Sequence, residues 1–340
     1  FGNYLIDQGY ICHLLIDGRG YKYVNNFNGK VIKILSTHFG YNIIKNIKFF
    51  ILMPIGFLQS MFYLLKIRPS VGIAFGSYAS FNPLLVFIFF RYLGLSSVFL
   101  HEQNSVIGKV NNFFCYFVNK IFLNFKKTQN IKTKYLHKCF SLGMPINHNI
   151  AYVYRNKKNI DNKIKRIFVS GGSQGAINLN NKISKILTKL SKEIDIKLEV
   201  TMQCPNNQKH YMKKIFKDKN ISLTLKSYFD NVIETLYNND VLFSRSGAGT
   251  IQDIINTQIP SILIPLPNST NQHQLYNAKF LEDKKSVIRI DENNLDTENS
   301  YLLIKNLIND INLQNNLIAN LQKIKISNSN MLIAKEMDLV

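Results

Sequence analysis

The sequence lacks the features typical of zinc-binding, secreted and membrane-spanning proteins. Its four cysteines lie far apart, with no C-x-x-C pair and no spacing that suits zinc. We therefore expect reduced thiols and a cytosolic protein. No basic segment followed by an apolar one opens the chain, which predicts that there is no signal peptide. No uncharged apolar run reaches the ~18 residues of a membrane span, and residues 49–65 come nearest.

Acidic residues are scarce, and arginine is scarce among the basic ones. The chain has 42 lysines and arginines against 21 acidic residues, which gives a net charge of +21. Lysine, asparagine and isoleucine are abundant, as expected of a chain encoded by A+T-rich DNA, so the charge is weak evidence for a nucleic-acid partner. Arginine supplies most bidentate contacts to bases. We expect no nucleic acid as a partner, and phosphate groups or an anionic membrane surface as partners of the positive charge.

The length and the hydrophobic pattern predict two α/β domains. The chain has 340 residues, of which 46% are hydrophobic, and this excludes a disordered chain. Short β-branched runs alternate with longer helical stretches, a pattern typical of parallel sheets. A lysine- and asparagine-rich stretch at residues 147–165 marks the domain boundary. The predicted strands are residues 10–16, 71–75, 97–100, 119–124, 166–170, 197–202, 222–226, 240–244 and 261–265, and the later predicted helices include residues 273–281 and 312–340.

Two glycine-rich turns follow predicted strands in the second half. Residues 171–176 read GGSQGA, and residues 244–253 read SRSGAGTIQD. A strand, a glycine-rich turn and a helix direct backbone N–H groups and the positive helix end to one point, which suits a diphosphate. The alternative is an ordinary turn whose glycines serve packing. Because the carboxyl ends of parallel strands share one edge of a sheet, we expect both turns to line the same rim.

Three further groups of polar residues are candidates for a site. Asp253, in the first turn of a predicted helix, could accept hydrogen bonds from a diol such as ribose, or simply be a favourable charge there. The HEQN motif at residues 101–104 closes a buried strand, where polar groups are costly; alternatively, its histidine is structural. Gln274 and Asn277 lie one helical turn apart and could present amides to a sugar, or form an exposed polar face. No D-x-D pair is present, which disfavours a metal.

The stretch at residues 43–65 has two interpretations. Lys45 and Lys48 precede a long apolar run, an arrangement typical of a helix that lies in a membrane interface. The alternative is a buried helix, and the sequence alone leaves both open.

The order of these motifs is that of a known family. HEQN at residues 101–104, GGSQGA at 171–176, SRSGA at 244–248 and Q-x-x-N-A at 274–278 all match it. The chain resembles the bacterial MurG-type N-acetylglucosaminyltransferases of glycosyltransferase family 28, which convert lipid I to lipid II in peptidoglycan synthesis. The likeness extends over nearly the whole chain.

The resemblance implies an α/β fold with two Rossmann-like domains facing across a cleft, the GT-B glycosyltransferase fold. Residues 1–147 would form an acceptor-binding and membrane-associated domain, residues 148–324 a domain that binds the UDP-sugar, and residues 325–340 a helix that returns to the first domain. The resemblance also implies a peripheral enzyme on the cytoplasmic face of the bacterial inner membrane.

The activity implied by the resemblance is an inverting sugar transfer. The 4-hydroxyl of undecaprenyl-diphospho-N-acetylmuramoyl-pentapeptide, lipid I, would displace UDP from UDP-N-acetylglucosamine. The implied partners are these two substrates and the anionic surface of the inner membrane. No cofactor and no metal is expected, because helix N-termini would stabilise the charge on the leaving diphosphate.

The resemblance assigns site residues position by position. The backbone of Phe229 would read uracil, Asp253 would face the ribose diol, and Gln274 would bind the sugar hydroxyls. Gly76 and Tyr78 would lie in a glycine loop that faces the acceptor diphosphate. The residues expected at UDP-N-acetylglucosamine are Asn104, Ser173, Phe229, Ala248, Gly249, Thr250, Ile251, Gln252, Asp253 and Gln274, and the candidates on the acceptor side are Gly76, Tyr78, His101 and Glu102.

The chain departs from the family pattern in three places. Asp253 stands where the family has glutamate, and Asn147 where it has arginine. The family's opening GGTGGH loop, which supplies the favoured histidine for the general base, has no match in the chain, and we expect the central strand before it to be missing as well. The catalytic residue is therefore unassigned, and weak turnover is expected. The alternative is a relic that retains only nucleotide-sugar binding.

Overall fold

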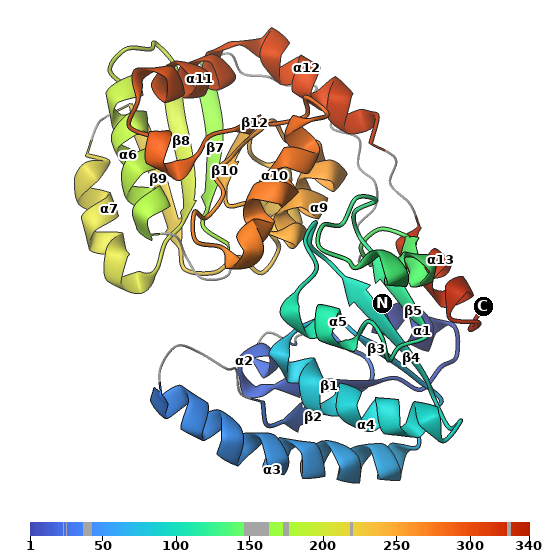
Figure 1. The fold of residues 1–340 in the computed structure, drawn as a ribbon. Coiled ribbons are helices and arrows are strands. Elements are labelled where there is room, and N and C mark those ends of the chain that lie inside the picture. The colour runs from blue at the N-terminus through green and yellow to red at the C-terminus, as the bar shows by residue number, and fades with distance from the viewer. Residues whose placement is uncertain are drawn as a thin grey trace. The chain divides into compact units, whose positions relative to one another are not determined.

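The computed structural model describes residues 1–22, 24, 26–36, 43–145, 163–172, 177–217, 220–324 and 328–340. Within this part the chain forms two compact units built around parallel strands (Figure 1). Unit 1 comprises Phe1–Asn149 and Ser327–Val340, and unit 2 comprises Ile150–Ile326. The predicted α/β class is confirmed in both units.

Unit 1 contains two parallel sheets. Its strands are β1 (His13–Asp17), β2 (Lys30–Ile34), β3 (Val71–Ala74), β4 (Ser97–Glu102), β5 (Lys120–Leu123) and β6 (Cys139–Ser141). One sheet has the order β3-β4-β5-β6 and the other pairs β1 with β2. The sequence predicted β1, β3, β4 and β5 near their observed positions. It did not predict β2, which carries two lysines in five residues, or β6, which has only three residues.

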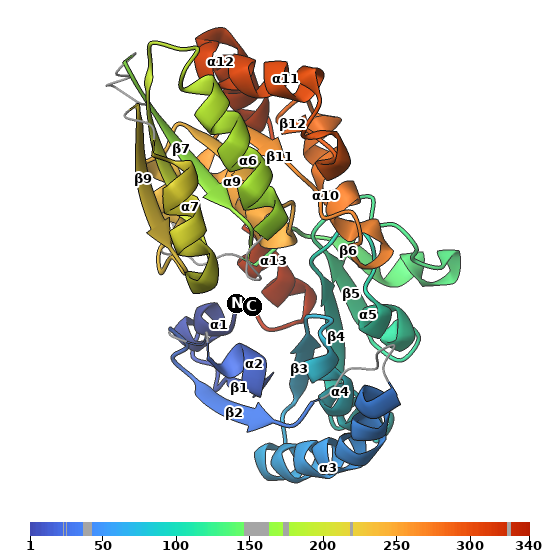
Figure 2. The ribbon, with the colours of Figure 1, turned by 90° about the vertical axis from the view of Figure 1, so that its left-hand side faces the viewer.

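Helices cover the sheets of unit 1. They are α1 (Gly2–Asp7), α2 (Gly18–Tyr21), α3 (Ile43–Ile67), η1 (Tyr78–Ser80), α4 (Phe81–Tyr92), α5 (Lys109–Phe114), η2 (Thr133–Lys138) and α13 (Ser329–Glu336). α3 packs beside α4 (Figure 2), with Leu64, Val86 and Phe90 buried between them. A Cβ on Gly56 of α3 would lie 2.5 Å from the carbonyl oxygen of Leu35, so only glycine allows this close approach. In the described ranges, no helix is both long and apolar enough to cross a membrane.

The last helix belongs to unit 1 although it follows unit 2 in the chain. Ile333 and Met337 are buried against Phe99 of β4 and Phe122 of β5, and these two phenylalanine rings stack with centroids 5.6 Å apart. The Nζ of Lys120 also forms an ion pair with Oε2 of Glu336 at 2.9 Å. Burial of apolar side chains on an aromatic surface therefore holds α13 against this sheet.

Unit 2 is built on one six-stranded parallel sheet. Its strands are β7 (Ile164–Ser170), β8 (Lys197–Gln203), β9 (Ile221–Lys226), β10 (Val241–Ser244), β11 (Ser261–Leu263) and β12 (Ile288–Arg289), in the order β12-β11-β10-β7-β8-β9. Five of them were predicted from β-branched runs, whereas the two-residue β12 was not. In the register of the sheet, Ser244 at the end of β10 lies opposite Ser170 at the end of β7.

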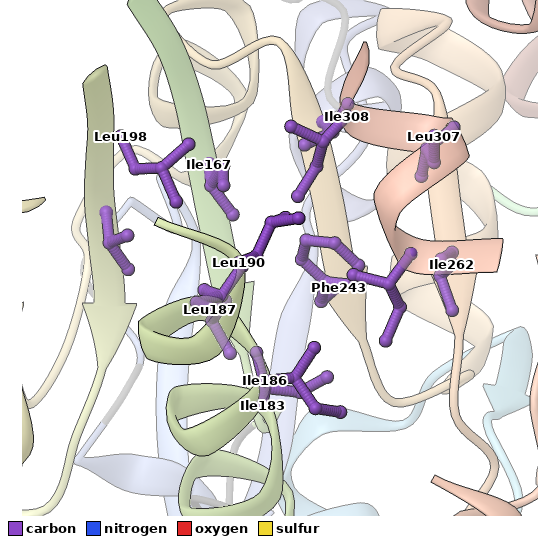
Figure 3. Close-up of a cluster of buried hydrophobic side chains, with 14 of the residues drawn as sticks. Ile167, Ile183, Ile186, Leu187, Leu190, Leu198, Phe243, Ile262, Leu307 and Ile308 are labelled. Carbon is purple, nitrogen blue, oxygen red and sulfur yellow. The ribbon is translucent and has the colours of Figure 1, made fainter. Parts of the chain in front are cut away.

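The core of unit 2 lies between this sheet and its helices (Figure 3). Ile183 and Leu187 of α6 and Leu307 of α11 are fully buried together with Ile167 and Phe243 of the central strands. Each such side chain contributes roughly 1.5–3 kcal/mol of transfer free energy. The helices are α6 (Ile177–Leu190), η3 (Asn206–Gln208), α7 (Lys209–Ile215), α8 (Val232–Tyr237), α9 (Ala248–Thr257), η4 (Thr270–Gln272), α10 (His273–Glu282), η5 (Glu292–Asn294), α11 (Glu298–Asn309) and α12 (Ile311–Gln322).

The closing helical stretch predicted at residues 312–340 is two helices rather than one. α12 packs in unit 2 and α13 in unit 1. A uniform amphipathic pattern does not reveal which of two hydrophobic cores each turn will join. The periodicity therefore did not divide the stretch, and only the family resemblance implied a separate helix at residues 325–340.

Candidate functional site

The two glycine-rich turns of unit 2 leave neighbouring strands at the same edge of the sheet. β7 leads into Gly171 and Gly172, and β10 leads into residues 245–247, with Ser170 opposite Ser244. Gly172 has φ +73°, a left-handed conformation that favours glycine. The expectation that the two strand exits are adjacent is confirmed. Ser173 and the rest of the GGSQGA motif lie outside the described residues.

The turn after β10 opens a helix whose first amides are unshielded. Gly247 is the N-cap residue of α9 and provides no side-chain cap, and the first intrahelical bond runs from the N–H of Ile251 to the carbonyl of Gly247. The N–H groups of residues 248–250, in the first turn of the helix, have no partner within the helix. A Cβ on Gly249 would meet nothing within 4 Å, so the space in front of this turn is open. Such a helix start attracts an anion.

A buried ion pair fixes the turn after β10. Arg245 and Glu292 are 6% and 7% exposed, and Nη1 of Arg245 lies 3.0 Å from Oε2 of Glu292. The same Nη1 donates to the carbonyl oxygens of Ile264 and Pro265 at the exit of β11. Neither a role for Arg245 nor the involvement of Glu292 was predicted, because two residues so far apart in the chain carry no local signal. Glu292 also lines a small pocket with Pro265, Pro267, Gln272, Leu275, Asp291 and Asn293.

Two hydrogen bonds tie the same turn to α10. The Oγ of Ser246 donates to the carbonyl oxygen of Gln274 at 2.7 Å, and Nδ2 of Asn277 donates to the carbonyl oxygen of Ser246 at 3.1 Å. Asn277 is fully buried, so the hypothesis that it presents its amide to a sugar beside Gln274 is wrong, as is the alternative of an exposed polar face. Gln274 is partly exposed, and its Oε1 accepts from the N–H of Leu266 at 3.0 Å.

The remaining candidates in unit 2 lie along α9 and after β9. Burial raises the pKa of Asp253 to about 7, because desolvation disfavours the charged carboxylate. Ile251 is buried in the core, which leaves only its backbone for a ligand. Gln252 donates through Nε2 to Asn256 at 2.9 Å. Phe229 is buried, with its ring edge-on to Phe168 at a centroid distance of 5.1 Å.

In unit 1, His101 is buried at the end of β4 and is neutral. Burial lowers its pKa to about 4. Its Nε2 lies 2.9 Å from the carbonyl oxygen of Gly143, and because a carbonyl only accepts, Nε2 carries the proton. Nδ1 is then a buried acceptor, without a partner among the described residues. The ring packs against Phe75 at a centroid distance of 5.3 Å.

Glu102 is also buried, and its oxygens bind the loop that follows. Oε1 accepts from the backbone N–H of Asn104 at 3.0 Å and from its Nδ2 at 3.3 Å. Oε2 accepts at 2.8 Å both from the N–H of Gly108 and from Nδ2 of Asn111. Asn111 is a residue that the sequence analysis missed, because it stands in an ordinary helical stretch.

The glycine loop after β3 lies directly over Asn111. Gly76 has φ +75°, and a Cβ on it would be 2.6 Å from Nδ2 of Asn111. Tyr78 begins η1 and is partly buried against the hydrophobic core of unit 1. Unit 1 therefore brings Gly76 and Glu102 together at one buried amide, and Glu102 in turn binds Asn104. In the described residues of both units, no three His, Cys, Asp or Glu side chains gather as metal ligands would.

Comparison with known proteins shows which family has these motifs. Residues 166–336 match the glycosyltransferase family 28 C-terminal domain. The chain is 32% identical over 333 residues to the UDP-N-acetylglucosamine–N-acetylmuramyl-(pentapeptide) pyrophosphoryl-undecaprenol N-acetylglucosamine transferase of Rickettsia felis, covering 95% of the chain and 89% of that protein. The chain belongs to the MurG-type transferases of glycosyltransferase family 28. The transferase of the same name from Rickettsia bellii is 30% identical, with the same coverage of both chains.

Solved structures share the fold of this family 28 chain. The crystal structure of Acinetobacter baumannii MurG has a TM-score of 0.74 at 19% identity, over 99% of this chain and 93% of that one. The calicheamicin glycosyltransferase CalG4 has a TM-score of 0.64 at 8% identity, over 98% and 91%. The chain thus has the GT-B glycosyltransferase fold class that the motifs implied.

Proposed function

We propose that the chain transfers N-acetylglucosamine from UDP-N-acetylglucosamine to the 4-hydroxyl of undecaprenyl-diphospho-N-acetylmuramoyl-pentapeptide, converting lipid I to lipid II with inversion. The observation that carries the proposal is the open start of α9 beside the exit of β7 in a chain of this family. Helix N-terminal amides and dipoles stabilise a diphosphate that gains charge as it leaves.

Unit 2 would bind the donor. The diphosphate would lie at Ala248, Gly249 and Thr250, with Ser173 supplying a hydroxyl from the neighbouring turn. Asp253 would accept hydrogen bonds from the ribose diol, and the backbone of Phe229 would read uracil. The buried contacts of Arg245, Ser246 and Asn277 hold the turn in place before the ligand arrives, and this reduces the entropy cost of binding. The further contacts would come from Ile251 and Gln252, and Gln274 would bind the sugar.

Unit 1 would bind the lipid acceptor through the loop that contains Gly76 and Tyr78. Asn104 would reach the donor sugar. His101 is buried and neutral, so its part would be to support the loop rather than to act as a charged ligand. A peripheral location on the cytoplasmic face of the inner membrane would give this unit access to its lipid substrate.

The membrane-facing surface would be the outer face of α3. Its exposed apolar side chains recur at helical spacing, and Phe89 and Tyr92 of the neighbouring α4 are exposed as well. Lysines in the first turns of α3 and at its end would meet anionic lipid head groups. The exposed residues of this face on α3 are Ile51, Ile55, Leu58, Phe62 and Leu65.

Sedimentation with anionic vesicles tests this surface. We expect the full chain to sediment, and Lys45→Glu with Lys48→Glu to reduce the bound fraction roughly tenfold or more, since each lysine near such a surface is worth about 1 kcal/mol. The control is Lys126→Glu with Lys127→Glu, the same charge change at exposed residues elsewhere in unit 1. If the control loses as much bound fraction, the net charge of the chain and not the α3 surface causes the binding. If neither variant loses bound fraction, the membrane contact lies elsewhere.

The decisive assay of the activity is transfer of labelled N-acetylglucosamine to a lipid I analogue by the full chain, with UDP-N-acetylglucosamine binding measured by calorimetry on the same preparation. Product formation that requires both substrates is expected. Binding without transfer would instead support the alternative of a relic that keeps only the nucleotide-sugar site. A folded chain that binds no UDP-sugar would refute both.

A further inference from the structure

Three separate segments of unit 1 meet at the side chains of Glu102 and Asn111. Both are buried, at 3% and 0% exposure. The carboxylate of Glu102 accepts four N–H donors, two from Asn104, one from Gly108 and one from Asn111, at 2.8–3.3 Å. The same Nδ2 of Asn111 donates to the carbonyl oxygen of His101 at 3.2 Å. The exit of β4 and the start of α5 are therefore joined through one buried anion.

Asn111 extends this network to the glycine loop after β3. A Cβ on Gly76 would lie 2.6 Å from Nδ2, 2.9 Å from Cγ and 3.1 Å from Oδ1 of Asn111. The loop thus rests on the amide with no room for an intervening methyl group. Because Glu102 and His101 both accept hydrogen bonds from Nδ2 of Asn111 and so hold its amide, the position of Gly76 is set by Asn111.

We propose that Glu102 and Asn111 are positioning residues for the transfer reaction, with different targets. Asn111 fixes the position of the Gly76 loop and so controls binding of the acceptor. Glu102 holds Asn104 and so affects binding of the donor sugar as well. This proposal rests on the proposed function, in which the Gly76 loop faces the acceptor diphosphate. Both side chains are buried, so in this proposal they act through Gly76 and Asn104.

The Michaelis constants of the two substrates distinguish this positioning role from a merely structural one. If the network only stabilised the fold, its loss would lower the melting temperature and the amount of active enzyme, and both Michaelis constants would stay unchanged. A displaced Gly76 loop instead raises the KM for the acceptor, while the nucleotide site in unit 2 keeps its affinity for the donor.

The first test compares Asn111→Ala with Asn112→Ala, the exposed neighbour on the same helix. We expect Asn111→Ala to raise the acceptor KM about fivefold or more, the effect of one lost buried hydrogen bond, and to leave the donor KM within about twofold. Asn112→Ala should change neither. An unchanged acceptor KM in folded Asn111→Ala, or an equal rise in both constants, would overturn the proposal.

The second test uses the contact between Gly76 and Asn111. Gly76→Ala should impair acceptor binding and lower the melting temperature, because the new Cβ meets the amide. Adding Asn111→Ala removes the atoms that it meets and should restore part of both losses, although the strain of a positive φ on alanine remains. If the effects of the two substitutions simply add, the contact does not set the loop.

A third variant tests Glu102 directly. Glu102→Gln keeps the volume but turns a donor toward N–H groups that need an acceptor. It should raise the KM of both substrates, unlike Asn111→Ala. A rise in the acceptor KM alone would contradict the proposal that Glu102 affects both substrates and Asn111 only the acceptor. If the wild-type chain binds UDP-N-acetylglucosamine but transfers nothing, the proposed function fails. Measurable wild-type turnover with an unaltered acceptor KM in Asn111→Ala would refute the positioning role alone.

Discussion

The two units use the ends of parallel strands in opposite ways. In unit 2 the exit of β10 opens into a helix start with small residues and free space at Gly249. In unit 1 the exit of β4 is closed over by a buried histidine, a buried carboxylate and a buried amide. Backbone amides at a helix start suit a diphosphate of fixed shape. A network of buried side chains fixes loops in one position, at the cost of desolvating polar groups. Unit 2 thus presents backbone amides at a strand exit, whereas unit 1 uses buried side chains to fix the loops at its own strand exit.

The largest effect on stability is expected at the buried ion pair of Arg245 and Glu292, where unit 2, like unit 1, fixes a turn with buried charged side chains. Glu292→Ala would leave the buried Arg245 without its carboxylate and should lower the free energy of unfolding by about 3–5 kcal/mol. Denaturant unfolding measures the change. Lys305→Ala, which breaks a partly exposed pair with Glu193, is the control and should cost less than about 1 kcal/mol. Equal losses of unfolding free energy in Glu292→Ala and Lys305→Ala would show that the Arg245 contact does not fix the turn.

His101 should make the stability of unit 1 sensitive to acid. Its pKa is about 4 in the fold against an ordinary value of 6.5, so the unfolded chain takes up the proton first as the pH falls. The stabilisation by neutral His101 is complete above about pH 6.5 and is lost towards pH 4, by about 3 kcal/mol in total. Melting curves of the wild type and His101→Gln across this range would test it. Parallel pH profiles in the two proteins would contradict it.

Gly249→Asp should separate stability from binding in unit 2. The position is exposed and open, and a carboxylate in the first turn of a helix stabilises it by about 0.3–1 kcal/mol. The same charge repels a diphosphate, so we expect UDP affinity in calorimetry to fall roughly tenfold or more, while the melting temperature stays or rises. Gly249→Ala is the neutral control. Undiminished UDP affinity in Gly249→Asp would place the diphosphate elsewhere.

The smallest effect on UDP affinity is expected from Asp253. Its pKa is raised to about 7, so its ionisation is completed only above neutral pH. A ribose diol donates hydrogen bonds and therefore binds best to the ionised carboxylate. UDP affinity should therefore rise between pH 6 and pH 8, by at most about tenfold. Asp253→Asn should bind with a flatter pH profile. Identical profiles for the two proteins would remove Asp253 from the site.

The contrast between the units also explains what the sequence could predict. The strands of unit 2 stand out because β-branched runs such as residues 166–170 are separated by glycine-rich turns, and a parallel sheet brings their exits together by topology alone. The open helix start at Ala248 is therefore visible in the sequence. The strand β2 was missed because its lysines at positions 30 and 33 obscure the apolar alternation.

Contacts between distant residues could not be predicted in the same way. The pairing of Arg245 with Glu292 and the position of Asn111 beneath Gly76 depend on tertiary packing. Asn277 was misjudged because helical spacing indicates which residues share a face, but not whether that face is buried. The HEQN motif was recognised from the sequence, but the contacts of Glu102 with Asn104 and Asn111 required the structure.

The position of α13 has a consequence for how the protein is made. Phe99 and Phe122 precede all of unit 2 in the chain, whereas Ile333 and Met337, which cover them, follow it. Unit 2 can complete its own core first, since all of its strands and helices precede residue 327. During synthesis the first unit therefore keeps an aromatic surface uncovered until residues beyond unit 2 have been made, and hydrophobic surface exposed in this way is prone to aggregation.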